Sequence, residues 1–196
     1  MERKKFEVKY NQLQTRINKI KDHFDFNPAI NGLTPLQNDK IRGMLLLCHA
    51  EFESYIESLA LLLINDAKDK WDRTHRANYN LASLLICSSI DKKETVETKV
   101  NKMIVDYKKQ TIGNNHGLRE HNIKDIFGPL GYCIGDFDSL FIATLDSFGC
   151  DRGEVAHSSA KTSTMYDKAT ETSRIDGIVR DFYDFQEVLL SKSNKF

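Results

Sequence analysis

Two residues in the C-terminal part of the sequence carry side chains suited to metal-free chemistry at a phosphodiester. Arg152 and His157 stand five positions apart in the stretch DRGEVAHSS, residues 151–159. An imidazole, with a reference pKa of about 6.5, can take up or release a proton near neutral pH. A guanidinium can bind a phosphate through two parallel hydrogen bonds and stabilise growing negative charge on its oxygens. The pair therefore predicts acid–base chemistry at a phosphate, although such a pair also arises by chance on helix surfaces.

The local pattern predicts that a new helix begins at this stretch. We expect Gly149 to end the preceding helix and Asp151 to cap the next one, with Glu154 bonding back to the cap. At 100° per residue, Arg152 and His157 then point about 140° apart around one helix axis. One chain does not easily aim both side chains at one small spot, so a second protomer would complete the site.

The rest of the sequence shows apolar residues at helical spacing and no alternation typical of strands. It predicts long helices over about residues 3–25, 35–68 and 170–192, the second begun by a capping box of Thr34 and Gln37. Asp136 is expected to cap a further helix over FDSLFIATLDSF. Other segments predicted to be helical are LASLLICSSI and about residues 92–109 and 122–130. The fold class is therefore all-α, a bundle with four main helices plus short helices.

Composition limits the classes of protein that this chain can belong to. Its 196 residues, 40% of them hydrophobic, favour one domain over residues 1–196. Twenty-eight basic residues balance twenty-eight acidic ones, so any binding to nucleic acid must use a local patch. The charged N-terminus and the short apolar runs predict a cytoplasmic protein with no membrane contact. The four cysteines lack C-x-x-C spacing and are expected to be free and mostly buried.

Two further groups of polar residues are candidates for a functional role. His49 and Glu53 stand four apart on the long second helix and could orient the catalytic pair, although a solvated face that includes Arg42 and Glu57 is the simpler interpretation. The polar stretch of residues 68–80 reads as a surface loop. It nevertheless combines cationic and stacking side chains of the kind that bind single-stranded RNA, namely Lys70, Trp71, Arg73, His75 and Arg76.

The sequence gives little support for a metal ion or another cofactor. His116 and His121 lie five positions apart (H-x4-H) in a glycine-rich break, without the cysteines or the helical spacing that zinc sites usually show. No phosphate-binding glycine motif of the G-x-x-x-x-G-K-[ST] or G-x-G-x-x-G type occurs, and no G-x-S-x-G. We therefore expect no metal and no cofactor.

Taken together, RGEVAH, the polar segment after it and the final helix resemble the R-x4-6-H motif of the HEPN superfamily (higher eukaryotes and prokaryotes nucleotide-binding). The stretches LLLCHAEFESYIESL and GLREHNIKDIFGPLG are similar to its bacterial RiboL-PSP-HEPN branch. The resemblance covers about residues 35–192. One departure is Gly153, where the family often has asparagine or another polar residue directly after the arginine.

This resemblance implies a two-fold homodimer in which the two motifs face each other. It also implies a metal-independent endoribonuclease, typical of toxin–antitoxin or antiviral defence systems, that acts on cellular RNA such as tRNA. Arg152 and His157 would then be catalytic, with Glu154, Ser158, His49 and Glu53 orienting them or touching the substrate. An antitoxin or another defence protein would be the expected partner. Two alternatives stay open: a catalytically inactive HEPN-like module that binds a nucleotide, RNA or a protein, and a helical scaffold unrelated to RNA.

Overall fold

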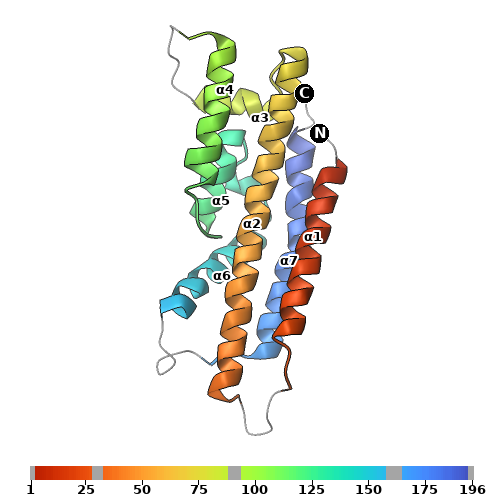
Figure 1. Cartoon of the computed structure of the whole chain (residues 1–196), viewed down its shortest axis with the longest axis vertical. Coiled ribbons are helices and arrows are strands. Elements are labelled where there is room, and N and C mark those ends of the chain that lie inside the picture. Colours follow the sequence, from red (N-terminus) through yellow and green to blue (C-terminus); the bar gives the residue numbers. More distant parts are fainter. Residues whose placement is uncertain (1–2, 28–32, 88–93, 158–164, 194–196) are drawn as a thin grey trace.

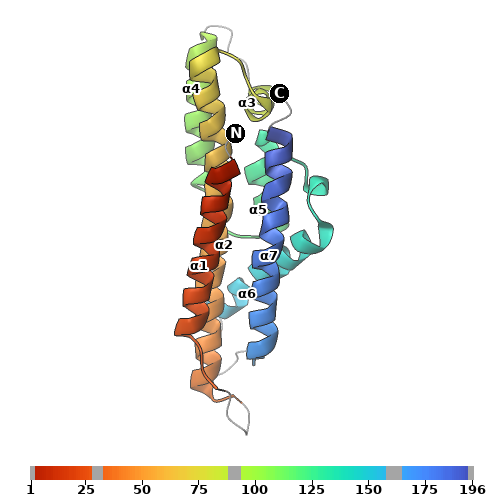
Figure 2. The same ribbon diagram turned by 90° about the vertical axis from the view of Figure 1, so that its right-hand side faces the viewer.

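The computed structural model describes residues 3–27, 33–87, 94–157 and 165–193, and side chains of all these except residues 153–157. Three long helices run side by side along the molecule: α1 (Arg3–His23), α2 (Pro35–Thr74) and α7 (Lys168–Ser193) (Figures 1 and 2). Within the described ranges every regular element is a helix. The predicted all-α class is thus confirmed, and the predicted first and last helices agree with α1 and α7.

Ion pairs at both ends of α1 show how it packs on α7. Arg3 pairs with Glu187 at 2.5 Å, and Lys21 pairs with Asp176 at 2.5 Å. Residue numbers that rise along α1 therefore fall along α7, so the two helices are antiparallel. The core between the three helices is aromatic and aliphatic, with Phe6, Phe52 and Phe182 fully buried. Burial of this shared apolar surface holds the bundle together.

Helix α2 begins as the sequence predicts and ends later. Thr34 accepts a hydrogen bond from the Gln37 backbone at 3.2 Å, and the Gln37 side chain accepts one from the Thr34 backbone at 2.9 Å. The predicted end near residue 68 was wrong, because the helix continues to Thr74 before His75 turns into the left-handed region at φ 51°. Trp71 explains the extra turns: it packs against the core and so gives this polar segment an apolar anchor.

Helix α6 (Ser139–His157) is the largest correction to the sequence prediction. It runs without a break through Gly149, so no new helix begins at Asp151. A Cβ at position 149 would lie 3.2 Å from Cγ and 3.4 Å from the backbone nitrogen of Arg119. Gly149 therefore serves close packing against the segment that leads into α5 (Glu120–Phe127) and does not end the helix.

The N-terminus of α6 also differs from the prediction. Asp138, rather than Asp136, caps it by accepting the Phe141 backbone N–H at 2.8 Å. Asp136 closes the short 3-10 helix η3 (Ile134–Asp136), where it accepts the Cys133 N–H at 2.7 Å and pairs with Lys192 of α7. Two aspartates two residues apart thus divide the roles that the sequence assigned to one.

The remaining elements pack beside the upper half of α2 (Figure 1). They are α3 (Tyr79–Cys87), α4 (Val96–Asp106), the π-helix η1 (Tyr107–Ile112), α5 and the 3-10 helix η2 (Gly128–Leu130). Two buried tyrosine hydroxyls fasten them: Tyr107 donates to the Ile126 carbonyl at 2.7 Å, and Tyr132 donates to the Leu189 carbonyl at 2.9 Å. Helix α5 in turn supports α6.

Two predictions drawn from composition have different outcomes. Cys48 is buried, but Cys87, Cys133 and Cys150 are exposed, so the expectation of mostly buried cysteines was wrong. All four are free thiols, as predicted. Among the described helices, none combines the length and the apolar character that crossing a bilayer requires.

Candidate functional site

Helix α6 lies against the N-terminal half of α2 as far as Phe148 and Arg152. Phe141, Leu145 and Phe148 form the buried stripe of α6 at steps of four and three. Arg152 occupies the next position on that stripe, one turn beyond Phe148, where the core gives way to solvent. The helix therefore carries Arg152 to the edge of the α2–α6 contact, and its side chain is exposed there.

His49 of α2 is buried beneath this end of α6. Its side chain is only 3% exposed, and its ring lies nearly parallel to that of Phe148, with centroids 6.2 Å apart. The expectation of a solvated face is therefore wrong at His49, because α6 covers it. Burial, together with the positive charge of Arg152, lowers the pKa of His49 to about 4. His49 is thus a neutral imidazole at neutral pH and a poor proton acceptor there.

Glu53 of α2 is the carboxylate that pairs with His49. Its Oε2 atom lies 3.7 Å from Nδ1 of His49, one helical turn away, and its side chain is 18% exposed. The structure thus places His49 and Glu53 side by side, with His49 close enough to Arg152 for the charge of Arg152 to affect its ionisation. This arrangement suits a role in positioning the end of α6.

Arg174 of α7 fastens the turn of α6 that carries Arg152. It donates to Asp151 Oδ2 at 2.5 Å and to Ser147 Oγ at 2.9 Å, and its guanidinium lies 5.1 Å from the centre of the Phe148 ring. This role of Arg174 was not predicted from the sequence. A surface arginine on the last helix has no local motif that would reveal a contact with residues 23 and 27 positions away.

The two neighbouring cations of this region differ in their partners. Arg174 is paired with Asp151 and also lies 3.6 Å from Glu171. Arg152, in contrast, has no carboxylate partner among the residues whose side chains the structure describes, and it borders a small hollow with Leu45, Leu46 and Phe148. An exposed guanidinium on a helix whose position is fixed by other contacts can bind an anion.

The chain matches the RiboL-PSP-HEPN family over residues 11–192. The chain belongs to this family. The match confirms the resemblance seen in RGEVAH and its surroundings, and it begins earlier than expected, within α1. No curated protein and no solved structure matches the chain.

The RiboL-PSP-HEPN motif lies only partly within the described residues. The backbone of α6 includes Glu154 and His157, but their side chains lie outside the description, and Ser158 lies outside it altogether. The backbone shows that Arg152 and His157 share one continuous helix, so the angle of about 140° between them still applies. Family membership supports a ribonuclease or a related HEPN module.

The basic residues proposed to bind RNA lie far from Arg152 in this RiboL-PSP-HEPN chain. Lys70, Trp71, Arg73 and Arg76 occupy the upper end of α2 and the turn after it, whereas α6 ends beside the lower half (Figure 1). At 1.5 Å per residue, position 70 is roughly 30 Å along α2 from His49. Arg73 donates to its own helix at the Asp69 carbonyl, at 3.1 Å. The structure does not bring these two groups together within one chain.

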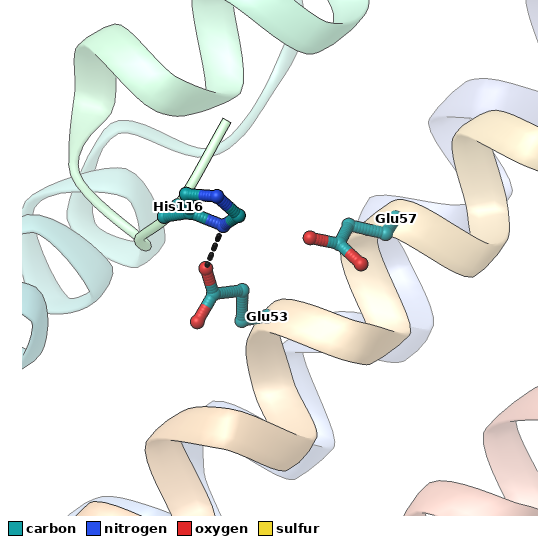
Figure 3. Close-up of side chains that lie close together, drawn as sticks. All are labelled: Glu53, Glu57 and His116. Atoms are coloured by element: carbon teal, nitrogen blue, oxygen red, sulfur yellow. Dashed lines mark ion pairs between the residues drawn. The ribbon is translucent and has the colours of Figure 1, made fainter. Parts of the chain in front are cut away.

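A cluster that the sequence reasoning missed lies one and two turns beyond His49 on α2. Glu53 and Glu57 meet His116, which comes from the segment before α5 (Figure 3). The i,i+4 spacing of the glutamates was visible in the sequence, but nothing local linked them to a histidine about sixty positions later. His121, which the sequence paired with His116, is exposed on α5 and is not part of this cluster.

Proposed function

We propose that the protein is a metal-independent endoribonuclease whose active site forms between two copies of the chain. The observation that carries the proposal is the state of Arg152. It is exposed, it continues the buried stripe of α6 by one turn, and it has no carboxylate partner among the described side chains. Beside it, Arg174 takes up Asp151 and leaves Arg152 available for a phosphate. The family motif contains this arginine, which adds to the proposal.

The proposed reaction needs three groups. The 2′-hydroxyl of the RNA attacks the adjacent phosphorus, and one His157 accepts the proton of that hydroxyl. The bond from phosphorus to the 5′-oxygen breaks, and a second His157 donates a proton to that oxygen, which leaves a cyclic phosphate and a free 5′-hydroxyl. Arg152 stabilises the negative charge on the non-bridging oxygens.

A dimer meets the demand for two proton transfers. Each chain supplies one motif histidine, and Arg152 and His157 point about 140° apart on one helix. A two-fold axis would bring both motifs together, so that the arginine of one protomer and the histidine of its partner face one phosphate.

The buried pair next to Arg152 would play a supporting part. With its pKa lowered to about 4, His49 stays neutral and does not compete as the general base at neutral pH. It fills the space beneath Phe148, while Glu53 lies on its outer side at 3.7 Å. We infer that His49 and Glu53 position the end of α6, and that Glu154 and Ser158 act near the substrate. Lys70, Trp71, Arg73 and Arg76 would touch only a remote part of a long RNA.

The decisive experiment is RNA cleavage in EDTA by the purified full-length protein. We expect the wild type to cut total RNA, Arg152→Ala and His157→Ala to lose this activity, and Arg180→Ala to keep it. Arg180 is a matched control because it is an exposed arginine, paired with Asp181 at 3.0 Å on α7. Sedimentation should show a dimer.

Two results would overturn the proposal. If no protein concentration cuts RNA, the chain is the catalytically inactive module that binds a nucleotide, RNA or a protein. If cleavage survives both motif substitutions, it comes from another site or from a contaminant. Co-purification from the native host would identify an antitoxin or another defence partner.

A further inference from the structure

Glu53, Glu57 and His116 converge from two separate parts of the chain. One potential ligand atom of each, two carboxylate oxygens and an imidazole nitrogen, lies within 4.8 Å of the other two. Figure 3 shows both carboxylates turned toward the ring of His116. Oε1 of Glu53 lies 3.8 Å from Nδ1 of His116.

Each element holds its residue in place. The glutamates are one turn apart on α2 and so lie on the same face of a long, rigid helix. His116 is exposed, but both of its neighbours are fixed by Asn122 at the start of α5. The buried Asn115 donates to the Asn122 carbonyl at 2.7 Å and accepts from the Asn122 side chain at 2.5 Å.

Gly117 fixes the other side of His116. Gly117 has a φ of 137°, a backbone conformation that residues with a Cβ rarely adopt. A Cβ there would also lie 2.9 Å from Oδ1 of Asn122. The backbone on both sides of His116 is therefore set by packing against Asn122, and this packing carries the ring to α2.

Among the residues that the structure describes, no lysine or arginine forms an ion pair with the two carboxylates of the cluster. Among the described residues, the groups that pair with Glu53 are two imidazoles, His49 at 3.7 Å and His116 at 3.8 Å. No described lysine or arginine forms an ion pair with Glu57. Because the two carboxylates lie one turn apart on the same face of α2, their negative charges repel each other. A bound cation would relieve this repulsion.

We propose that Glu53, Glu57 and His116 bind a divalent first-row transition-metal ion, with Zn²⁺ the best match. One imidazole and two carboxylates form a mixed nitrogen and oxygen set that suits zinc, whereas Mg²⁺ and Ca²⁺ prefer oxygen ligands alone. Ligand distances of about 2.0–2.2 Å place donor atoms roughly 3–4 Å apart around one ion. Side-chain torsions of three partly exposed residues can close the remaining gap.

The metal ion would link α2 to the segment before α5. It would join residue 57 to residue 116 and hold α5, which packs against Gly149 of α6 through the Arg119 segment. The role is structural and goes beyond the proposed function, which needs no metal. RNA cleavage in EDTA and Zn²⁺ binding can therefore be tested independently of each other.

The test is Zn²⁺ titration of the full-length protein after removal of metal with EDTA and desalting, followed by calorimetry. We expect one His116-dependent site per chain. His116→Ala should weaken it by about 100-fold or more, since even substitution of a partner outside the ligand set commonly costs 10–100-fold. Glu57→Gln should weaken it as well, and a large excess of Mg²⁺ should not displace Zn²⁺.

His121→Ala is the matched control, because His121 is also exposed, five positions away on α5, and outside the cluster. It should bind Zn²⁺ like the wild type, and Zn²⁺ should raise the unfolding temperature of both but not of His116→Ala. Circular dichroism checks that each variant is folded. Absence of a saturable site, survival of the site in His116→Ala, or equal loss in His121→Ala would each overturn the proposal. None of these results depends on RNA cleavage.

Discussion

Two regions of α2 carry the polar residues that the sequence singled out, and they differ in what covers them. Around His49, helix α6 packs over α2 and buries an imidazole beneath Phe148 and next to Arg152. Around residues 70–76, Arg73 and Arg76 stay exposed, and Arg73 turns back to its own helix. The second region has more cationic residues in sequence, but the first has polar groups supplied by several elements.

This difference shows what separates a candidate site from a charged surface. At the His49 region, α7 holds α6 through Arg174, and α6 holds Arg152 above α2. At the upper end of α2, the described contacts of Lys68 and Arg73 stay within one helix. Convergence of elements fixes the positions of side chains, and catalysis at a phosphate depends on fixed positions.

The largest expected effect is on RNA cleavage, from a substitution that keeps the charge. Arg152→Lys should lower the cleavage rate by about 100-fold, because an ammonium cannot replace the planar two-point contact of a guanidinium with a phosphate. Arg76→Lys should change it less than about threefold, since a distant contact requires only charge. Single-turnover cleavage of one defined RNA measures both. Equal losses would place the two regions on one functional surface and remove the contrast between them.

The contrast also explains which parts of the site were predictable. Arg152 and His157 are five positions apart, so their spacing and the family motif were visible in the sequence. The burial of His49 was not, because it depends on α6, about a hundred residues later, covering that face of α2. The roles of Arg174 and His116 are equally non-local, and no short pattern reports such contacts.

The fold was predictable where local rules decide it. The capping box at Thr34 located the start of α2, and the apolar stripes of α1 and α7 placed those two helices within a few residues. Gly149 and Trp71 misled the prediction because tertiary packing overrode local preference. Gly149 allows Arg119 to pack closely against α6, and Trp71 packs the polar end of α2 against the core.

The next effect concerns stability and compares one aromatic anchor from each region. Phe148→Ala should lower the free energy of unfolding by about 3–5 kcal/mol, since Phe148 is 3% exposed and contacts Phe52 and His49. Trp71→Ala should cost about 1–2 kcal/mol, because Trp71 is only partly buried. Urea unfolding followed by circular dichroism measures both. A larger loss for Trp71→Ala would mean that the end of α2 is the better-packed region.

A smaller effect separates the ion pairs of the two regions. Arg174→Gln should cost about 1 kcal/mol, because Arg174 joins α6 to α7 through Asp151 and Ser147. Lys68→Gln should cost about 0.3–0.5 kcal/mol, since Lys68 pairs with Asp72 within one helix and that carboxylate is half exposed. The same urea experiment at low salt measures both. If the two values agree, the Arg174 contact does not fasten α6.

The smallest effect is a pH dependence at Glu171, which lies beside Arg174. Burial foremost raises the pKa of Glu171. Among the described residues no group donates a hydrogen bond to its Oε2 atom, and Arg174 lies 3.6 Å from that atom. A carboxyl whose pKa is higher in the folded state holds its proton longer there, so stability falls as pH rises from the unfolded pKa, about 4.3, through the folded pKa. Glu171→Gln removes that fall, and its urea midpoint should rise relative to the wild type between pH 4 and pH 7. If the midpoint difference between the variant and the wild type is the same at both pH values, Arg174 fully compensates the buried charge of Glu171. The α6–α7 contact would then be a balanced ion network without an unsatisfied carboxylate.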